Sequence, residues 1–265
     1  MQTFVRWAGS KRSLIRELAE YWTEDSERYV EPFAGSACLF FHLEPKAAMI
    51  SDLNAELISM YRELQRDVEL VLECFRRLRK GERAYYAIRR QDPRLLSKPE
   101  AAARFLYLNR YCFNGLFRTN QTGTFNVPYG PPKRPLKTFE VRVREAAALI
   151  KHVEFRVCDF EVVLKDIRKG DFVYLDPPYV VDERRIFSDY LPGSFSKHDL
   201  DRLSTALEAI DSAGASFLLS YADSHEARRL ARNWSKHPVS TRRNIAGFVG
   251  ARKVAGELLV TNIRA

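Results

Sequence analysis

The stretch Asp171-Phe-Val-Tyr-Leu-Asp-Pro-Pro-Tyr179 decides the fold that the sequence predicts. Its first half, 171–175, is an apolar run with the length and composition typical of a strand buried on both faces of a sheet. Its second half, Asp176–Tyr179, lies where such a strand would leave the sheet, and its two consecutive prolines fix φ and make the turn rigid. The tetrapeptide is therefore the first candidate for a catalytic site.

This tetrapeptide suits the methylation of an amino group on a flat base. The exocyclic amine of adenine is a poor nucleophile because its lone pair is delocalised into the ring. A carboxylate from Asp176 and the main-chain carbonyl of Pro177 can both accept hydrogen bonds from one NH₂ group, and a rigid turn through Pro178 would keep them in position. Tyr179 offers a flat face for stacking a base that has been flipped out of its duplex, a step that costs roughly a few kcal/mol. The alternative is a proline-rich turn in which Tyr179 simply packs.

The segment Tyr29–Ser36 is the candidate for binding the methyl donor. A short strand there runs into a turn of small residues around Gly35, and small residues let a ligand approach the backbone. We expect a helical stretch, Ala37–Leu43, to follow. The apolar run 47–51 then ends in Asp52, about 20 residues after the glycine turn, where a carboxylate can accept hydrogen bonds from ribose hydroxyls. The alternative role for Asp52 is a helix N-cap, and one carboxylate could serve both purposes.

Strand-like runs alternate with helical patterns along most of the chain. This alternation predicts an α/β fold with a doubly wound, mostly parallel seven-stranded sheet. The runs lie at 29–33, 47–51, 153–158, 171–175, 216–220, 237–243 and 257–263. The long gap before 153 instead shows helix-period segments at 55–78, 82–90 and 97–110. A turn-rich stretch follows, and its Asn120-Gln-Thr-Gly123 predicts the tip of a hairpin.

The charge of the chain favours a polyanionic partner. The 265 residues include 43 Lys and Arg against 34 Asp and Glu, which gives a formal net charge of +9. A merely basic protein is the alternative, but the basic residues also cluster, as at 76–80 and 89–90. Some of these clusters should be solvated helix faces rather than phosphate contacts.

The remaining composition excludes several classes of protein. No apolar stretch approaches membrane-spanning length, and Met1–Glu17 is too charged and broken for a signal peptide, so we expect no membrane association and a cytoplasmic location. Four cysteines and five histidines are scattered without ligand spacing. They predict reduced thiols and no metal site.

In their order along the chain, the motifs resemble the Dam-type N6-adenine DNA methyltransferases of the D12 class, also called the alpha group. The resemblance covers nearly the whole chain, and several motifs in one order are far more specific than any one of them. They are Trp7-Ala-Gly-Ser-Lys11, Glu31-Pro-Phe-Ala-Gly-Ser36, Ser51-Asp-Leu-Asn54, Cys158-Asp-Phe160, Asp176–Tyr179 and Ser216-Phe-Leu-Leu-Ser-Tyr221. The chain departs from the family at Ala37, where other members often have glycine.

The resemblance implies S-adenosylmethionine as the cofactor. Lys11 would pair with the carboxylate of the donor, Asp52 would hold the ribose, and Asp159 with Phe160 would contact the adenine ring. Asp176 would lie between donor and acceptor and could touch both. The implied cofactor-binding residues are Trp7, Lys11, Glu31, Phe33, Gly35, Asp52, Asp159, Phe160 and Asp176.

The resemblance also implies double-stranded DNA as the substrate. Residues 1–54 and 151–265 would form the S-adenosylmethionine-binding catalytic domain, and 55–150 the DNA target-recognition domain. The candidate DNA-binding residues are Asn114, Arg118, Asn120, Gln121, Thr122, Asn126, Lys133 and Arg134. Amides and hydroxyls at the hairpin tip are suited to base edges, and the basic residues to phosphates. The tip Gln121-Thr122 stands where members that read GATC commonly carry a basic residue, so GATC is not implied; the alternative for the whole stretch is a plain exposed loop.

Other activities are alternatives to adenine-N6 methylation of DNA. Enzymes of related fold that act on RNA or on protein amides usually begin the Pro-Pro-Tyr turn with Asn, so Asp176 disfavours them. N4-cytosine methylation stays open because the cytosine amine poses the same chemical problem, although that class more often begins the turn with Ser. A catalytically silent DNA-binding protein is disfavoured by the intact Asp176–Tyr179. We expect a monomer, with a cognate restriction endonuclease as a candidate separate partner.

Overall fold

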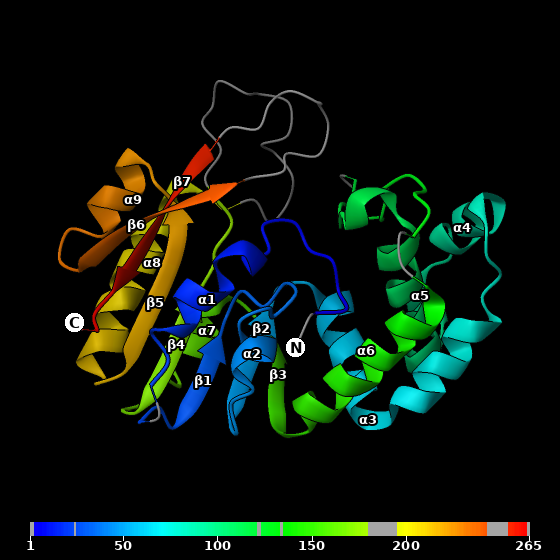
Figure 1. Cartoon of the computed structure of the whole chain (residues 1–265), viewed down its shortest axis with the longest axis horizontal. Helices are drawn as coiled ribbons and strands as arrows, with labels where there is room; N and C mark the ends of the chain where they lie inside the picture. Colours follow the sequence, from blue (N-terminus) through cyan, green and yellow to red (C-terminus); the bar gives the residue numbers. More distant parts are fainter. Residues whose placement is uncertain are drawn as a thin grey trace. The chain divides into compact units, whose positions relative to one another are not determined.

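A computed structural model describes residues 3–23, 25–120, 123–132, 135–179, 195–242 and 254–263 (Figure 1). The chain forms two compact units that interleave along the sequence. Unit 1 comprises Met1–Ser10, Gly35–Glu44 and Asp52–Val157, and unit 2 comprises Lys11–Ala34, Pro45–Ser51 and Cys158–Ala265. The assignment of one sequence region to catalysis and another to DNA recognition stays a prediction.

The predicted seven-stranded, mostly parallel sheet is confirmed, with the strand order β3-β2-β1-β4-β5-β7-β6. The strands are β1 (Arg28–Glu31), β2 (Ala48–Asp52), β3 (Val153–Val157), β4 (Asp171–Leu175), β5 (Ser216–Ala222), β6 (Ser235–Arg242) and β7 (Val254–Thr261). β1 pairs in parallel with β2 and β4, and β4 pairs in parallel with β5. β7 pairs antiparallel with β5 on one side and with β6 on the other.

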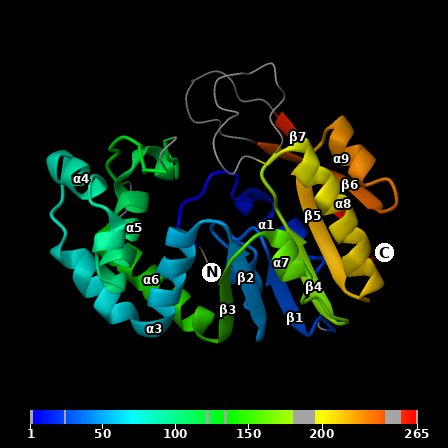
Figure 2. The same ribbon diagram turned by 180° about the vertical axis from the view of Figure 1, so that it is seen from behind.

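In unit 2 the central strand β4 is covered on both faces, as its apolar sequence predicted. Helices α7 (Phe160–Leu164) and α8 (Lys197–Ser212) lie in front of the sheet in Figure 2, and α1 (Ile15–Ala19) lies on the opposite face, in front in Figure 1. Phe172 in β4 is fully buried and meets Trp22 edge-on at 5.5 Å. At the start of β4 the buried Asp171 accepts two hydrogen bonds from Arg28, at 2.9 and 2.6 Å.

The other unit is largely helical, and the three long helices predicted in the insert are confirmed. The remaining helices of the described chain are α2 (Phe40–Leu43), α3 (Ala55–Arg77), α4 (Glu82–Arg89), α5 (Lys98–Tyr111), α6 (Leu136–Leu149) and α9 (His225–Leu230), with short 3₁₀ turns at Arg12–Leu14, Pro93–Leu95, Phe113–Gly115 and Ile150–His152. Helix α5 begins with a capping box in which Ser97 and Glu100 bond reciprocally. Within unit 1 the fully buried Tyr61 stacks on Phe155 at 5.4 Å.

The helix predicted for Ala37–Leu43 is shorter than expected and begins at Phe40. Ala37 has a φ of +47°, in the left-handed region, and so cannot belong to a right-handed helix. This conformation also explains why a glycine would suit the position, since glycine adopts positive φ without steric cost.

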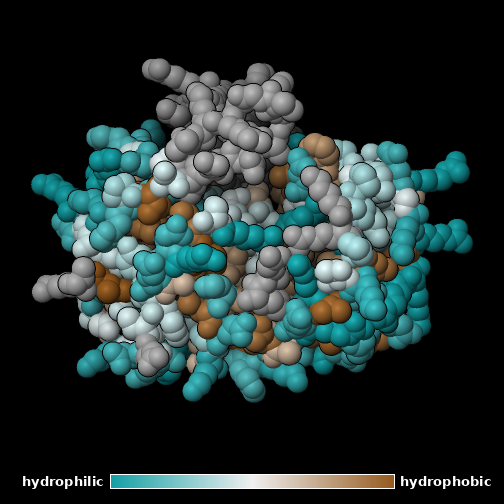
Figure 3. Space-filling model, in the orientation of Figure 1, coloured by the Kyte–Doolittle hydropathy of each residue, from teal (hydrophilic) through white to brown (hydrophobic). Residues whose placement is uncertain are grey.

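The surface and the helices bear on whether the described chain could cross a membrane. The face shown in Figure 3 is mostly hydrophilic, with apolar side chains scattered among the polar ones. Among the described residues, no helix combines the length and the apolar character needed to cross a membrane.

Candidate active site

Asp176 follows β4 directly, at the carboxyl end of the strand. Its Oδ1 accepts a hydrogen bond from Ser220 Oγ at 3.1 Å and forms an ion pair with Lys11 Nζ. Ser220 is fully buried in β5, the parallel neighbour of β4, and its hydroxyl lies 3.1 Å from that of Tyr174. Because the single hydroxyl proton of Ser220 goes to Asp176, Tyr174 is the donor in this second bond.

The ion pair controls the charge on Asp176. Burial raises the pKa of Asp176 above its ordinary 3.8, and Lys11 opposes that rise. Burial acts to lower the pKa of Lys11, but Asp176 and other acidic neighbours outweigh it and raise this pKa above 10.5. Lys11 therefore carries a full positive charge and favours the ionised form of the carboxylate that chemistry on an amine requires.

The rest of the tetrapeptide leads from the core to the surface. Pro177 is buried, Pro178 is exposed and Tyr179 is half-buried. The Tyr179 hydroxyl donates to the carboxylate of Glu257, at 2.8 and 3.0 Å from its two oxygens, and Lys11 also hydrogen-bonds this hydroxyl. Tyr179 therefore does more than pack, because its polar end belongs to the same network as Asp176.

Glu257 is a functional candidate outside the motifs, and Ser220 lies in the motif Ser216–Tyr221 but has no predicted role of its own. Glu257 lies in β7 and is only 2% exposed, although it directly precedes three apolar residues of the strand. An acid inside an apolar strand run is a usable sequence signal, because a charge is buried only where it is paired or hydrogen-bonded. Ser220 carries no such signal, since a serine in a strand is compatible with many environments.

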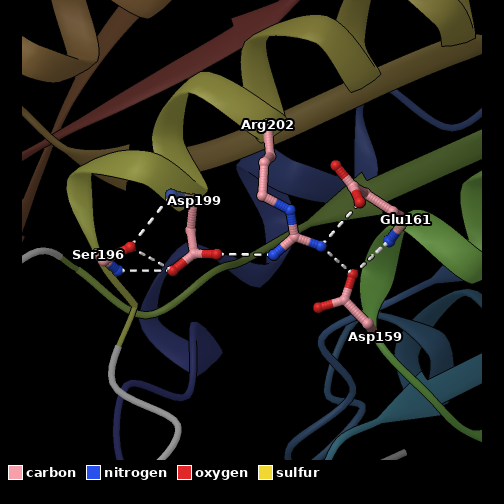
Figure 4. Close-up of polar contacts among 5 residues, drawn as sticks. All are labelled: Asp159, Glu161, Ser196, Asp199 and Arg202. Carbon is pink, nitrogen blue, oxygen red and sulfur yellow. Dashed lines mark hydrogen bonds and ion pairs between the residues drawn. The ribbon is translucent and has the colours of Figure 1, made fainter.

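Asp159, predicted to contact the adenine of a cofactor, belongs to an ion-pair cluster in unit 2 that is centred on Arg202 (Figure 4). Its Oδ1 accepts from Arg202 at 2.5 Å and from the backbone N–H of Glu161 at 3.0 Å, so that it also caps α7. Arg202 further donates to the carboxylates of Glu161 at 2.8 Å and Asp199 at 2.7 Å. Among the residues drawn in Figure 4, none bonds to the second oxygen of Asp159, and the Asp159 side chain is 32% exposed.

Aromatic side chains surround this carboxylate cluster. The Arg202 guanidinium lies 4.7 Å from the ring centre of Phe160, whose ring lies 5.3 Å from that of Phe33. Phe195 contacts both rings, at 6.3 and 6.1 Å. Glu31, the other implied residue of this segment, is 2% exposed and accepts a hydrogen bond from Tyr29 at 3.1 Å.

In unit 1, Trp7, Gly35 and Asp52 are close together. Gly35 has a φ of +47°, and a Cβ atom there would lie 2.6 Å from Trp7 Cδ1, so any other residue would be strained and would have to displace the Trp7 ring. The N–H of Gly35 donates to Asp52 Oδ2 at 3.0 Å, and the N–H of Asn54 donates to Oδ1 at 2.8 Å. The Trp7 ring stacks on Phe117 at 5.3 Å.

The interpretation of Asp52 as the N-cap of the following helix is wrong. The cap of α3 is Asn54, whose side chain accepts from the N–H of Leu57 at 2.9 Å. Asp52 instead links the glycine turn to the start of that helix, because it accepts hydrogen bonds from the N–H groups of Gly35 and Asn54. Each carboxylate oxygen can accept more than one hydrogen bond, so Asp52 keeps capacity for ribose hydroxyls. Burial raises the pKa of Asp52, and the two backbone N–H donors oppose that rise.

The predicted hairpin is present, and several of the predicted DNA-binding residues build it. Thr119 and Phe125 form an antiparallel bridge, and Arg118 Nε donates to the side-chain oxygen of Asn126 at 2.9 Å. The side chain of Asn120 accepts from the N–H of Thr124 at 2.9 Å. Asn114, with a φ of +53°, forms part of the turn that precedes the hairpin. Gln121, Thr122, Lys133 and Arg134 lie outside the described residues.

Three residues from elsewhere in unit 1 hold this loop and the end of the helix α5 that precedes it. Arg6 donates to the carbonyl oxygens of Asn109 and Arg110, both at 2.7 Å. Tyr85 donates to the carbonyl oxygen of Val127 at 2.8 Å, and Arg89 reaches the same oxygen at 3.0 Å. Arg89, one of the clustered basic residues, is thus engaged in holding the loop.

Two basic residues of the cluster at 76–80 are engaged in ion pairs. Arg76 and Arg77 form ion pairs with Glu140 and Glu73, both at distances within 2.7 Å, as solvated helix faces do.

In the part of the chain that the structure describes, no three His, Cys, Asp or Glu side chains gather as metal ligands would. Metal-independent activity stays a prediction, to be tested with EDTA.

Comparisons with known proteins agree with the motifs. Residues 7–245 match the family model described as D12 class N6 adenine-specific DNA methyltransferase. The chain is 33% identical to the Type II methyltransferase M1.LlaDCHI of Lactococcus lactis subsp. cremoris, over 99% of this chain and 95% of the relative. It is 32% identical to the Retron Ec67 DNA adenine methylase of Escherichia coli, over 99% and 92%, and 30% identical to the DNA adenine methylase of Salmonella typhi, over 97% and 94%.

Proposed function

Since the chain belongs to the D12 class of N6 adenine-specific DNA methyltransferases, we propose that Asp176–Tyr179 forms its catalytic site and that S-adenosylmethionine is its methyl donor. The activity of the chain is the methylation of adenine in DNA. The observation that supports the catalytic assignment is the half-buried carboxylate of Asp176, held between a protonated Lys11 and Ser220.

The residues of the two donor-binding clusters fit the groups of S-adenosylmethionine. Gly35 lacks a side chain where the backbone is crowded by Trp7, and Asp52 retains acceptor capacity for ribose hydroxyls. Asp159 presents an oxygen suited to an exocyclic amine, with the apolar ring of Phe160 next to it. Glu31 and Phe33 are proposed as further donor-site residues, and Lys11 as a partner for the carboxylate of the donor.

The chemistry of transfer needs no acid to activate a leaving group, because the sulfonium of the donor supplies a positively charged one. Asp176 and the carbonyl of Pro177 accept hydrogen bonds from the adenine amine and favour its tetrahedral form. With the donor bound, the bond from nitrogen to the methyl carbon would form as the carbon–sulfur bond breaks, and the Asp176 carboxylate that accepts a hydrogen bond from the amine would receive the proton that the methylated nitrogen loses. Tyr179 stacks on the adenine, which must leave the duplex to reach this turn.

Double-stranded DNA is the proposed form of the substrate, and the hairpin of unit 1 the proposed reader of its sequence. Asn120, Gln121 and Thr122 are the candidates for base edges, and Arg118, Lys133 and Arg134 for phosphates. Asn114 and Asn126 are proposed to contribute through the shape of the loop. A monomeric enzyme acting in the cytoplasm fits this proposal, as does a separate restriction endonuclease, which the Type II name of one relative makes worth testing.

The test combines the purified chain, labelled S-adenosylmethionine and duplex DNA, with methylation-aware sequencing of the product. Asp176→Ala should abolish transfer without loss of fold, and Asp176→Asn should fail nearly as badly because its amide lacks the charge and can present a donor. Asp201→Ala is the control, because Asp201 is an exposed partner of Arg229 on the helical surface. Activity of Asp176→Ala within about tenfold of the parent would contradict the catalytic assignment.

A further inference from the structure

Glu257 is a charged side chain in an apolar environment. It lies in β7 and is 2% exposed, and the strand continues with Leu258, Leu259 and Val260, each at most 2% exposed. Its backbone pairs with Ala222, at the end of β5. A carboxylate in such a place is costly unless hydrogen bonds compensate for the lost water.

The compensation comes from the catalytic turn. The Tyr179 hydroxyl donates to both oxygens of Glu257, at 2.8 and 3.0 Å. The same hydroxyl is hydrogen-bonded by Lys11, which also pairs with Asp176. Ser220, Asp176, Lys11, Tyr179 and Glu257 thus form one continuous chain of polar contacts.

We propose that Glu257 is a positioning residue for the methylation reaction: it fixes the ring of Tyr179 in the orientation that stacks the target adenine. The proposal rests on the proposed function of Asp176–Tyr179. A phenol has one O–H donor, and Glu257 accepts the hydrogen bond from it. Lys11 donates a hydrogen bond to the phenolic oxygen. These contacts hold the phenolic oxygen in place and so fix the direction of the axis from Cβ to the hydroxyl, while rotation about that axis is limited by what packs against the ring. The edge-on contact of Tyr179 with Tyr221, at 5.0 Å between ring centres, supports the same orientation.

This role differs from simple charge balance. If Glu257 served only to offset the charge of Lys11, a neutral acceptor in its place would fail as badly as an apolar residue. If it acts through the Tyr179 hydroxyl, a glutamine restores the function, because its amide oxygen accepts the same bond at the same volume. A leucine would remove the acceptor.

The experiment compares Glu257→Gln, Glu257→Leu, Tyr179→Phe and the double variant Glu257→Leu/Tyr179→Phe in the full chain. Base flipping is followed without donor, by the fluorescence of 2-aminopurine at the target position of a duplex, and transfer is followed in single turnovers. Glu257→Gln should stay within about threefold of the parent, whereas Glu257→Leu should lose roughly ten- to a hundredfold in the rate of transfer, the size expected for a displaced reacting group. Glu154→Gln, which alters an exposed acid paired with Arg156, is the matched control.

The double variant decides the outcome. Glu257→Leu should cause no further loss in the Tyr179→Phe background, because the hydroxyl through which Glu257 acts is already gone. The proposal would be overturned if the losses in transfer rate of the two single variants multiplied in the double variant. It would also be overturned if Glu257→Gln lost as much activity as Glu257→Leu. If Glu257→Leu fails to fold, Glu257→Gln and Tyr179→Phe still test the proposal. Base flipping must be preserved in Glu257→Gln and reduced in Tyr179→Phe. Failure of the proposed function has a separate signature, because Asp176→Ala would then retain activity.

Discussion

Ser220 holds Asp176 from the neighbouring strand, with 3.1 Å between its Oγ and Oδ1 of the carboxylate. The register of β4 and β5 pairs Leu175 with Leu219. The residues that follow them, Asp176 and Ser220, therefore lie at the same level of the sheet. The carboxylate that we propose as catalytic is therefore oriented by the rigid core rather than by a loop. This arrangement keeps the reorganisation needed during catalysis small.

Ser220→Ala should lower the rate of methyl transfer by roughly ten- to a hundredfold, because a hydrogen bond to a charged group contributes about 1.5–3 kcal/mol. Donor binding should change little. Single-turnover kinetics and calorimetric titration of S-adenosylmethionine separate the two effects. Ser216→Ala at the start of the same strand is the control, and a loss of equal size there would show that β5 is merely destabilised.

The Lys11–Asp176 pair predicts a shift in the pH dependence of activity. The reaction needs ionised Asp176, so activity is lost as the pH falls through the pKa of this group, which burial has raised above 3.8. Lys11→Met removes the charge that opposes the rise, so the acid limb of kcat/KM should move to higher pH by about 1–3 units. The pH profile of single-turnover rates at saturating donor measures the shift. A limb that stays in place would mean that Lys11 does not control the ionisation of Asp176.

Arg202 predicts a specific effect on donor recognition, because it bonds one carboxylate oxygen of Asp159 and none of the residues drawn in Figure 4 bonds the other. Arg202→Met should weaken the binding of S-adenosylmethionine about tenfold, as expected when a group that orients a ligand contact is lost. It should also reduce the preference for S-adenosylmethionine over its inosyl analogue, which lacks the exocyclic amine. Calorimetry with both compounds measures the preference. Arg229→Met, at the exposed pair with Asp201, should leave both affinities unchanged.

The glycine turn can be tested apart from catalysis. Gly35→Ala combines a positive φ with a clash against Trp7, and should lower the free energy of unfolding by more than the roughly 1–2 kcal/mol of backbone strain alone. Gly214→Ala is the matched control, because its φ of +72° imposes similar strain while the nearest atom to an added Cβ lies at an ordinary 3.4 Å. Urea unfolding gives both values. Equal losses would show that Trp7 moves away at no cost.

Local pattern predicted the sheet and the catalytic turn, but not the contacts that complete them. The apolar run 171–175 and the proline pair are properties of adjacent residues, so the end of β4 could be recognised from the sequence. Ser220 reaches Asp176 because β5 is the neighbour of β4, and Glu257 reaches Tyr179 because β7 pairs with β5; strand patterns do not encode either relationship. The early end of the helix predicted at 37–43 had a similar cause, since the left-handed Ala37 is set by the turn around it.

The hairpin contains residues that build the loop and residues that we propose to contact DNA. Arg118 Nε bonds the side chain of Asn126, and the backbone N–H of Asn126 donates to the carbonyl oxygen of Arg118 at 3.0 Å. Asn126→Ala should therefore release Arg118 and weaken binding to all DNA sequences about equally, with a salt slope reduced by about one if Arg118 contacts a phosphate.

Gln121→Ala and Thr122→Ala should instead relax or shift the methylated motif at one position, by roughly 1–3 kcal/mol of discrimination. Methylation of a randomised-sequence library by each variant, followed by comparison of the motifs, distinguishes the two classes. Arg118→Ala with Asn126→Ala supplies the internal control, because two residues that act as one unit should lose no more together than the more severe single variant. If the tip variants keep the parental motif while losing affinity, the tip serves as a backbone clamp, and the specificity of the enzyme lies elsewhere in residues 55–150.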